Sequence, residues 1–227
     1  NINHFATQGA SGGPVSILNS DLIREISFYT GSFPAARGGA LSSVMDITLR
    51  EGNKDKQAFK AVVGASEAGV SASGHFGKNT TYIASLRQSY LQLLFKLLGL
   101  PMLPNYIDGQ FKIKTSLGPH DEITFIGLAG FDNLRLNKEP DDKGDEYLLS
   151  YLPLLKQETF TIGSTYKHFS ERNIQTLTLS YNYLNNRSHK YLDNDETDPS
   201  GLILRSSGLE GKAQARFENR SYLAAWT

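Results

Sequence analysis

The chain has 227 residues, and its 23 Lys and Arg balance 23 Asp and Glu, so the formal net charge at pH 7 is zero. A neutral chain lacks the basic excess with which nucleic-acid-binding proteins neutralise phosphates, so we expect no nucleic-acid partner. The absence of Cys excludes disulfides and thiol catalysis. No apolar run reaches the roughly 18 to 20 residues of a membrane-spanning helix.

The two ends of the chain are those expected of a piece of a longer protein. It begins NINHF, with no initiator Met and no signal peptide, and it stops at AAWT inside a strand-like stretch. We therefore expect an excerpt.

The first part of the chain mixes short strand-like runs with turn residues. A helical turn is predicted at Asn19 or Ser20, because either side chain can accept a hydrogen bond from a free backbone N–H. Alternating apolar residues predict two short strands, Arg24–Thr30 and Val44–Leu49, on either side of a Gly-rich turn. The charged linker EGNKDKQ follows, so residues 1–54 are predicted to form a compact α+β piece.

Beyond this linker, the sequence alternates between apolar and polar residues with a period of two. From Tyr106 to Leu117 the odd positions are mostly apolar and the even positions are mostly polar, as in a strand with one apolar and one wet face. The same alternation recurs at 59–65, 68–76, 82–90, 123–131, 160–168, 176–183 and 209–217. Its phase reverses near Ser66 and Glu67, which predicts a tight bend there, because a one-residue slip turns every side chain to the other face. We expect about nine strands in residues 55–227.

The connections between these strands alternate between short and long. Tight turns are predicted at Gly77–Thr80, Gly118–Asp121, Ser170–Asn173 and Glu218–Arg220, and long links near 91–105, 134–157 and 186–201. This is the pattern of an up-and-down barrel with turns on one side of a membrane and loops on the other. A soluble β-sandwich is not expected to alternate short and long connections in this way. An odd strand count indicates an incomplete barrel, because single-chain bacterial barrels close with even numbers.

Residues 18–53, LNSDLIREISFYTGSFPAARGGALSSVMDITLREGN, resemble the C-terminal part of the plug domain of TonB-dependent outer-membrane receptors, in the form common in Bacteroidetes. The resemblance rests on the β-run IREISFYTG, the small-residue turn FPAARGGALSSV and the closing strand MDITLREGN. Ala36 departs from the aromatic that many members carry. The stretch FGKNTTYIASLRQSYLQLLFKLLGLP is similar to the first barrel hairpins of the family, including RxSYL at Arg87–Leu91.

This resemblance implies a mainly β fold, in which a fragment of a large antiparallel transmembrane β-barrel follows the end of an α+β plug domain. Residues 1–54 would be the C-terminal part of the plug, and residues 55–227 the N-terminal portion of the barrel. It also implies a Gram-negative outer-membrane location, contact with outer-membrane lipid, and import of a small, unidentified ligand. The TonB complex would engage through a segment N-terminal to this chain. We expect no catalytic residue, cofactor or metal.

Two sets of residues follow from this reading. The expected structural and polar contacts of the plug are Arg37, Gly38, Gly39, Asp46 and Arg50. The expected lumen-facing residues, on the wet faces of strands, are Lys112, Lys114, Lys212 and Arg216. Buried charges need partners, so we expect some of the second set to pair with charges of the first.

Other interpretations remain open beside an importer. The same scaffold could serve in adhesion or in a protein assembly without import, or, as a third choice, carry an enzyme. No nucleophile elbow, HExxH or P-loop motif supports catalysis, and His120 and Asp121 lie in a predicted turn. The plug stretch does not look like the glycan-importer form.

Three loop segments have two readings each. The acidic stretches 193–201 and 139–146 are either solvated loops or, with carboxylates as ligands, a cation site. The apolar stretch 90–100 is a short helix that either packs over the barrel mouth or binds ligand or a surface lipoprotein partner.

Overall fold

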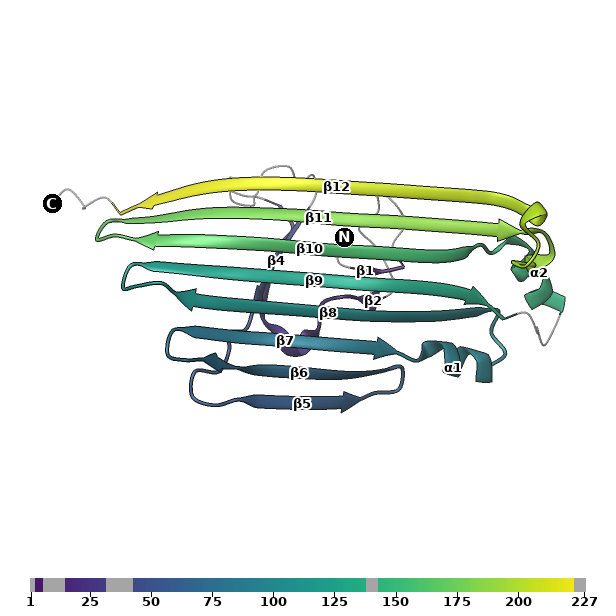
Figure 1. The fold of residues 1–227 in the computed structure, drawn as a ribbon, viewed down its shortest axis with the longest axis horizontal. Helices are drawn as coiled ribbons and strands as arrows, with labels where there is room; N and C mark the ends of the chain where they lie inside the picture. The colour runs from purple at the N-terminus through teal and green to yellow at the C-terminus, as the bar shows by residue number, and fades with distance from the viewer. Residues whose placement is uncertain (1–2, 6–14, 32–42, 138–142, 223–227) are drawn as a thin grey trace.

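The fold is a large antiparallel sheet with an N-terminal segment packed on one of its faces (Figure 1). The structure is a computed structural model, and it describes residues 3–5, 15–31, 43–137 and 143–222. The N-terminal segment, residues 3–53, contributes two small two-stranded sheets, β1 with β2 and β3 with β4. Their bounds are Asn3–His4, Val15–Ser16, Ile23–Tyr29 and Val44–Leu49.

The large sheet contains eight strands in chain order, each antiparallel to the next. They are β5 (Ala58–Val63), β6 (Glu67–Phe76), β7 (Thr80–Ser89), β8 (Met102–Ser116), β9 (Asp121–Leu136), β10 (Leu154–Phe169), β11 (Asn173–Tyr191) and β12 (Leu202–Ser221). The outer strands β5 and β12 do not pair with each other, so the sheet is open. The predicted fold class, mainly β with a large antiparallel sheet, is confirmed.

The helical elements are short. They are the 3-10 turns η1 (Ser20–Leu22), η3 (Leu192–Asn194) and η4 (Pro199–Gly201), and the helices α1 (Leu91–Leu97) and α2 (Lys143–Tyr151). The predicted turn near Asn19 is confirmed, since the Asn19 side chain accepts a hydrogen bond from the Asp21 N–H at 2.9 Å. The predicted bend near Ser66 is also confirmed, since β5 ends at Val63 and β6 begins at Glu67.

Strand ends differ from the prediction at the C-terminal side of the sheet. The turn predicted at Glu218–Arg220 is wrong, because β12 continues to Ser221 and pairs with β11 along its length. Backbone pairing with a long neighbour here outweighs the turn preference of the local sequence. The described residues after 55 hold eight strands rather than about nine.

The connections sort to the two ends of the sheet. The short turns 77–79, 117–120 and 170–172 lie at one end, and α1, α2 and the η3–η4 connection lie at the other (Figure 1). The short turn at 64–66 lies at the same end of the sheet as the long connections. Gly77 has φ +63°, a left-handed conformation that suits a glycine in a tight turn.

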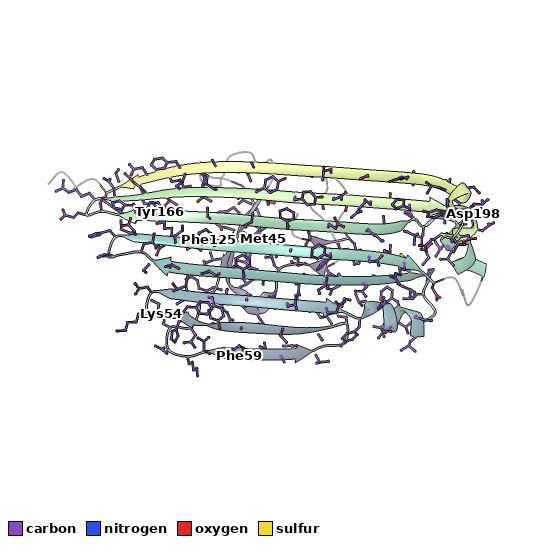
Figure 2. The ribbon with its side chains drawn as sticks, viewed as in Figure 1. Met45, Lys54, Phe59, Phe125, Tyr166 and Asp198 are labelled. Atoms are coloured by element: carbon purple, nitrogen blue, oxygen red, sulfur yellow. The ribbon has the colours of Figure 1, made fainter. Side chains whose placement is uncertain are left out.

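The two faces of the sheet differ in chemistry. Directly paired residues of neighbouring strands point to the same side, so the register sorts every side chain. We call the face on which the described residues of the N-terminal segment pack the covered face, and it is mostly polar. The opposite, open face is mostly apolar, and its members include Leu86, Phe111, Phe125, Phe131, Phe160, Ile162, Leu179, Tyr181, Leu209 and Phe217, all of them exposed. Figure 2 labels Phe125 on β9 and Tyr166 on β10.

Little of the apolar surface of the sheet is buried inside the chain. The buried apolar side chains near the N-terminal segment include Ile17, Leu22 and Ile83, whereas the open face leaves its large side chains uncovered. Soluble monomers rarely expose a contiguous apolar patch of more than a few hundred Å². The open face therefore needs an apolar environment.

Candidate functional site

The candidate site is a cluster of buried charges where β1 meets the covered face. His4 is fully buried, and its Nε2 lies 2.9 Å from Oδ2 of Asp108. Its Nδ1 contacts Oδ1 of Asp132, and the backbone N–H of Phe5 donates to the other oxygen of that carboxylate at 2.8 Å. An ionised carboxylate only accepts hydrogen bonds, so a histidine between two of them must donate from both nitrogens and carries a positive charge.

The pKa of His4 agrees with this assignment. Burial by itself lowers the pKa, but the hydrogen bonds and negative charges of Asp108 and Asp132 outweigh it, so the pKa is raised above the usual 6.5. The two carboxylates are themselves buried, and each would be costly without a cationic partner.

Strand register brings the two carboxylates together. Asp108 on β8 stands opposite Gly130 on β9, and Tyr106 stands opposite Asp132, so both carboxylates point from the covered face. A Cβ at Gly130 would lie 2.9 Å from Cδ1 of Ile17 and 3.1 Å from Cε1 of His4. The missing side chain thus makes room for the N-terminal segment.

Arg87 extends the cluster across three strands of the sheet. It stands opposite Asp108 in the register and binds that carboxylate with Nε at 3.0 Å and Nη2 at 2.9 Å. The same Nη2 donates to the backbone carbonyls of Ser16 at 2.8 Å and Ile17 at 3.0 Å. Nη2 has two N–H groups for these three acceptors, so one N–H is shared between two of them.

Glu67 and Tyr106 complete the cluster. Nη1 of Arg87 lies 3.4 Å from Oε1 of Glu67, and the Tyr106 hydroxyl donates to Oε2 of Glu67 at 2.7 Å. The Tyr106 ring also stacks on His4 at a centroid distance of 4.1 Å. We call these six residues, His4, Glu67, Arg87, Tyr106, Asp108 and Asp132, the His4 cluster. Two cations face three carboxylates, so the cluster is nearly balanced and suited to holding a segment in place.

A second contact holds the other end of the N-terminal segment. Lys112 Nζ lies 2.7 Å from Oε1 of Glu51 and 3.4 Å from the carbonyls of Leu49 and Arg50. Burial raises the pKa of Glu51, but the hydrogen bond and charge of Lys112 outweigh this and lower it below 4.5.

Backbone packing at Gly52 reinforces this second contact. A Cβ there would lie 2.5 Å from the backbone N and O of Tyr82 and 2.8 Å from the carbonyl oxygen of Gly74. Only glycine permits this approach, so the chain is pressed against β6 and β7 at the C-terminal end of the N-terminal segment.

The predicted plug contacts are only partly described. Arg37, Gly38 and Gly39 lie outside the described residues. Asp46 is half-buried on β4, and the Arg50 side chain donates from Nε to the carbonyl of Ile23 at 3.2 Å. That bond lies within the N-terminal segment.

The four predicted lumen-facing residues lie on the covered face, according to the register. Lys112 contacts the N-terminal segment, as above. Lys114 pairs with Glu122 at 3.0 Å, and Arg216 pairs with Glu218 at 3.0 Å. Lys212 is exposed on β12, beside a polar hollow that also includes Asn182.

The His4 cluster itself was not predicted. Its members are far apart in sequence, with 104 positions between His4 and Asp108 and 128 between His4 and Asp132. The sequence held one signal: Asp108 is at a polar position of the alternation, which indicates that its carboxylate points away from the apolar face. Naming its partners needs the register of three strands and the path of β1.

The structure also bears on the acidic loop segments 139–146 and 193–201. The carboxylates of Asp195 and Asp198 accept hydrogen bonds within their own turns, from Thr197 and Ser200. In the described part of the chain, no three His, Cys, Asp or Glu gather as metal ligands. The stretch 139–146 lies partly outside the described residues.

The helix α1 forms as predicted, and no residue of it is buried. Leu93, Leu94 and Leu97 are exposed, with Leu97 at 85%. No described helix is long and apolar enough to cross a membrane.

Comparison with known proteins supports the fold. No protein-family model matches the chain, and no curated protein matches it. Among solved structures, the crystal structure of a mutant of the ferric enterobactin receptor PfeA from Pseudomonas aeruginosa superposes with a TM-score of 0.64 at 12% sequence identity. The match covers 90% of this chain and 34% of the receptor, so the chain spans about a third of that protein. At this identity the likeness shows a receptor-like fold alone.

Proposed function

We propose that residues 1–54 are the C-terminal part of a plug and residues 55–227 the N-terminal portion of the barrel of a TonB-dependent outer-membrane receptor, which imports a scarce ligand. One observation carries the proposal. The covered face of the sheet is polar and holds the N-terminal segment through buried charges, while the open face is apolar and exposed. That asymmetry fits a barrel wall with lipid outside and a plug inside.

The physics of the bilayer supports this reading. Backbone polar groups have no water to bind in the hydrocarbon core, so a spanning sheet must close on itself. A tilted spanning strand needs about 9 to 11 residues. Strands β8 to β12 have 15 to 20 residues, long enough to cross and to project beyond the membrane.

The proposed partners follow from the same scaffold. The TonB complex would act through a segment N-terminal to this chain, and outer-membrane lipid would contact the open face. The exposed leucines of α1 offer a surface to a lipoprotein. The class of the small ligand is not identified. Since the superposed receptor is one for ferric enterobactin, ferric chelates are the first ligands to test.

The test is nutrient uptake by a strain that lacks the gene, beside a strain that lacks TonB, across a panel of ferric chelates, cobalamins, glycans and peptides. We expect both strains to lose uptake of the same nutrient, and the full-length gene to restore it in the deletion strain. If neither strain loses a nutrient and a protein partner co-purifies with the barrel, the import proposal is wrong and a role in adhesion or assembly replaces it.

A further inference from the structure

A group of cations lies on the open face, at the end of the sheet that carries the long connections. In the register, Lys156 on β10 stands directly opposite Arg187 on β11, and His189 stands directly opposite Arg205 on β12. We call these four residues the cationic rim. Lys156 and Arg205 are exposed, and Arg187 and His189 are partly exposed.

The rim lies one row of residues beyond the apolar band. Moving along β10 on this face, Lys156 is followed by Glu158 and then by Phe160, and on β11 Arg187 is followed by Asn185 and Tyr183. Neighbouring strands lie about 4.8 Å apart and two residues along a strand rise about 7 Å. The four side chains therefore start from a patch of about 10 by 7 Å, small enough to surround one headgroup.

This arrangement has an electrostatic cost that an anion would remove. Like charges directly opposite each other in a sheet are destabilising, and the rim contains the pair Lys156 and Arg187. Arg187 also pairs with Glu158. Among the described residues, no ion pair joins Lys156 or Arg205 to a carboxylate.

The other end of the open face lacks this excess of cations. The row beyond the apolar band there consists of Asp121, His168, Gln175 and Asn219, as the register places them. Asp121 accepts hydrogen bonds from the Tyr166 hydroxyl at 2.6 Å and from His168 at 2.8 Å. This row therefore contains no Lys or Arg on the open face.

We propose that the cationic rim binds the phosphate of an anionic membrane lipid whose acyl chains lie along the apolar band. The inference rests on the proposed function, because it requires the open face to be in a bilayer. Charge complementarity and continuity with the apolar band select a lipid headgroup as the occupant.

A groove below the rim fits the acyl chains. It has a volume of about 570 Å³ and is lined on the open face by Phe125, Ile162, Leu179, Tyr181, Ala213 and Ala215. Its small alanines on β12 lie beside larger side chains of β11, which creates the hollow.

The distance from rim to groove matches one leaflet of a membrane. Ile162 lies six residues beyond Lys156 on the same strand, which is about 20 Å at about 3.3 Å per residue. For a strand tilted by about 45°, this is about 14 Å along the membrane normal, close to half of the roughly 30 Å hydrocarbon core. A lipid with its phosphate at the rim would therefore reach the groove with its chains.

The test compares lipid retention by the full-length protein in phosphatidylcholine nanodiscs that contain lipid A with its phosphates or the same lipid A after dephosphorylation. The variant K156Q/R205Q removes two rim charges. The matched control, K78Q/R172Q, removes two exposed charges from the short turns. Retained lipid is measured by mass spectrometry after detergent exchange.

We expect the wild type and the control to retain the phosphorylated lipid preferentially, and K156Q/R205Q to lose about 30-fold of this preference, from a factor of about five for each cation near an anionic surface. Equal retention of both lipids by the wild type, or an equal loss in the control, would overturn the inference. So would displacement of the phosphorylated lipid by millimolar inorganic phosphate, because it would indicate a site for free phosphate rather than for a lipid headgroup. A protein that inserts into no nanodisc would overturn the proposed membrane function as well, so the two failures are distinct.

Discussion

The attachment of the N-terminal segment depends on the charge of His4, and the variant His4→Ala tests it. The substitution leaves Asp132, which is 4% exposed, with the Phe5 N–H and no cation, while Asp108 keeps Arg87. Removing one partner from a buried ion pair costs about 3 to 5 kcal/mol. The segment should therefore open about 10² to 10³·⁵ times more often than in the wild type.

The assay is hydrogen exchange of the Phe5 amide, which bonds directly to Asp132, in the full-length protein in detergent. A matched control is Lys60→Ala, which breaks an exposed pair with Asp21, where ion pairs contribute little. The double variant His4→Ala/Asp132→Asn removes the unpaired charge but keeps an oxygen that can accept from the Phe5 N–H, so it should recover part of the protection. If His4→Ala exchanges no faster than Lys60→Ala, the cluster does not hold the segment and the reasoning is refuted.

Three further predictions follow from the same contacts. Because the pKa of His4 is raised above 6.5, its contribution to the stability of the attached segment is complete below about pH 6.5 and is lost as pH rises through the higher folded pKa. Protease cleavage within residues 3–17 should therefore increase with pH in the wild type but not in His4→Gln. Gly52→Ala should detach the chain near Lys112 and lower the thermal midpoint, because its Cβ would meet fixed backbone at 2.5 Å, whereas Gly118→Ala meets nothing within 4 Å and should change the midpoint little. Ile162→Lys should destabilise the membrane-inserted protein by about 2 to 4 kcal/mol near mid-bilayer, as measured by urea unfolding in vesicles; a neutral result, matching Gln214→Lys on the covered face, would indicate that the open face is not in lipid.

Period-two alternation was enough to predict the sheet, but not the ends of its strands. The bend near Ser66 was predictable, because a phase reversal leaves a trace in the order of apolar residues. The extension of β11 to Tyr191 and of β12 to Ser221 was not, because each strand extends by pairing with its long neighbour. Local composition at the ends resembles loop sequence.

The same distinction applies to the site. Lys112 was predictable as a covered-face residue because parity alone assigns its side. The His4 cluster was not, because it requires knowing that Arg87 stands opposite Asp108 and that β1 crosses above Gly130. Register and the path of a distant segment are properties of the whole fold, and no short sequence motif encodes them.

The chemistry of the contact also bears on how a receptor of the proposed kind would work. An apolar covered face would hold the segment by burial alone, but it would expose apolar wall to water whenever the segment moved. In the His4 cluster, the carboxylates of Asp108 and Asp132 and the guanidinium of Arg87 exchange partners for water when His4 leaves, so solvation offsets part of the lost attraction. Charged contacts thus fix the position of the segment, through directional hydrogen bonds, at a lower cost of release. That combination is what a plug requires if it must seat in one place and yield to a pull from the periplasm.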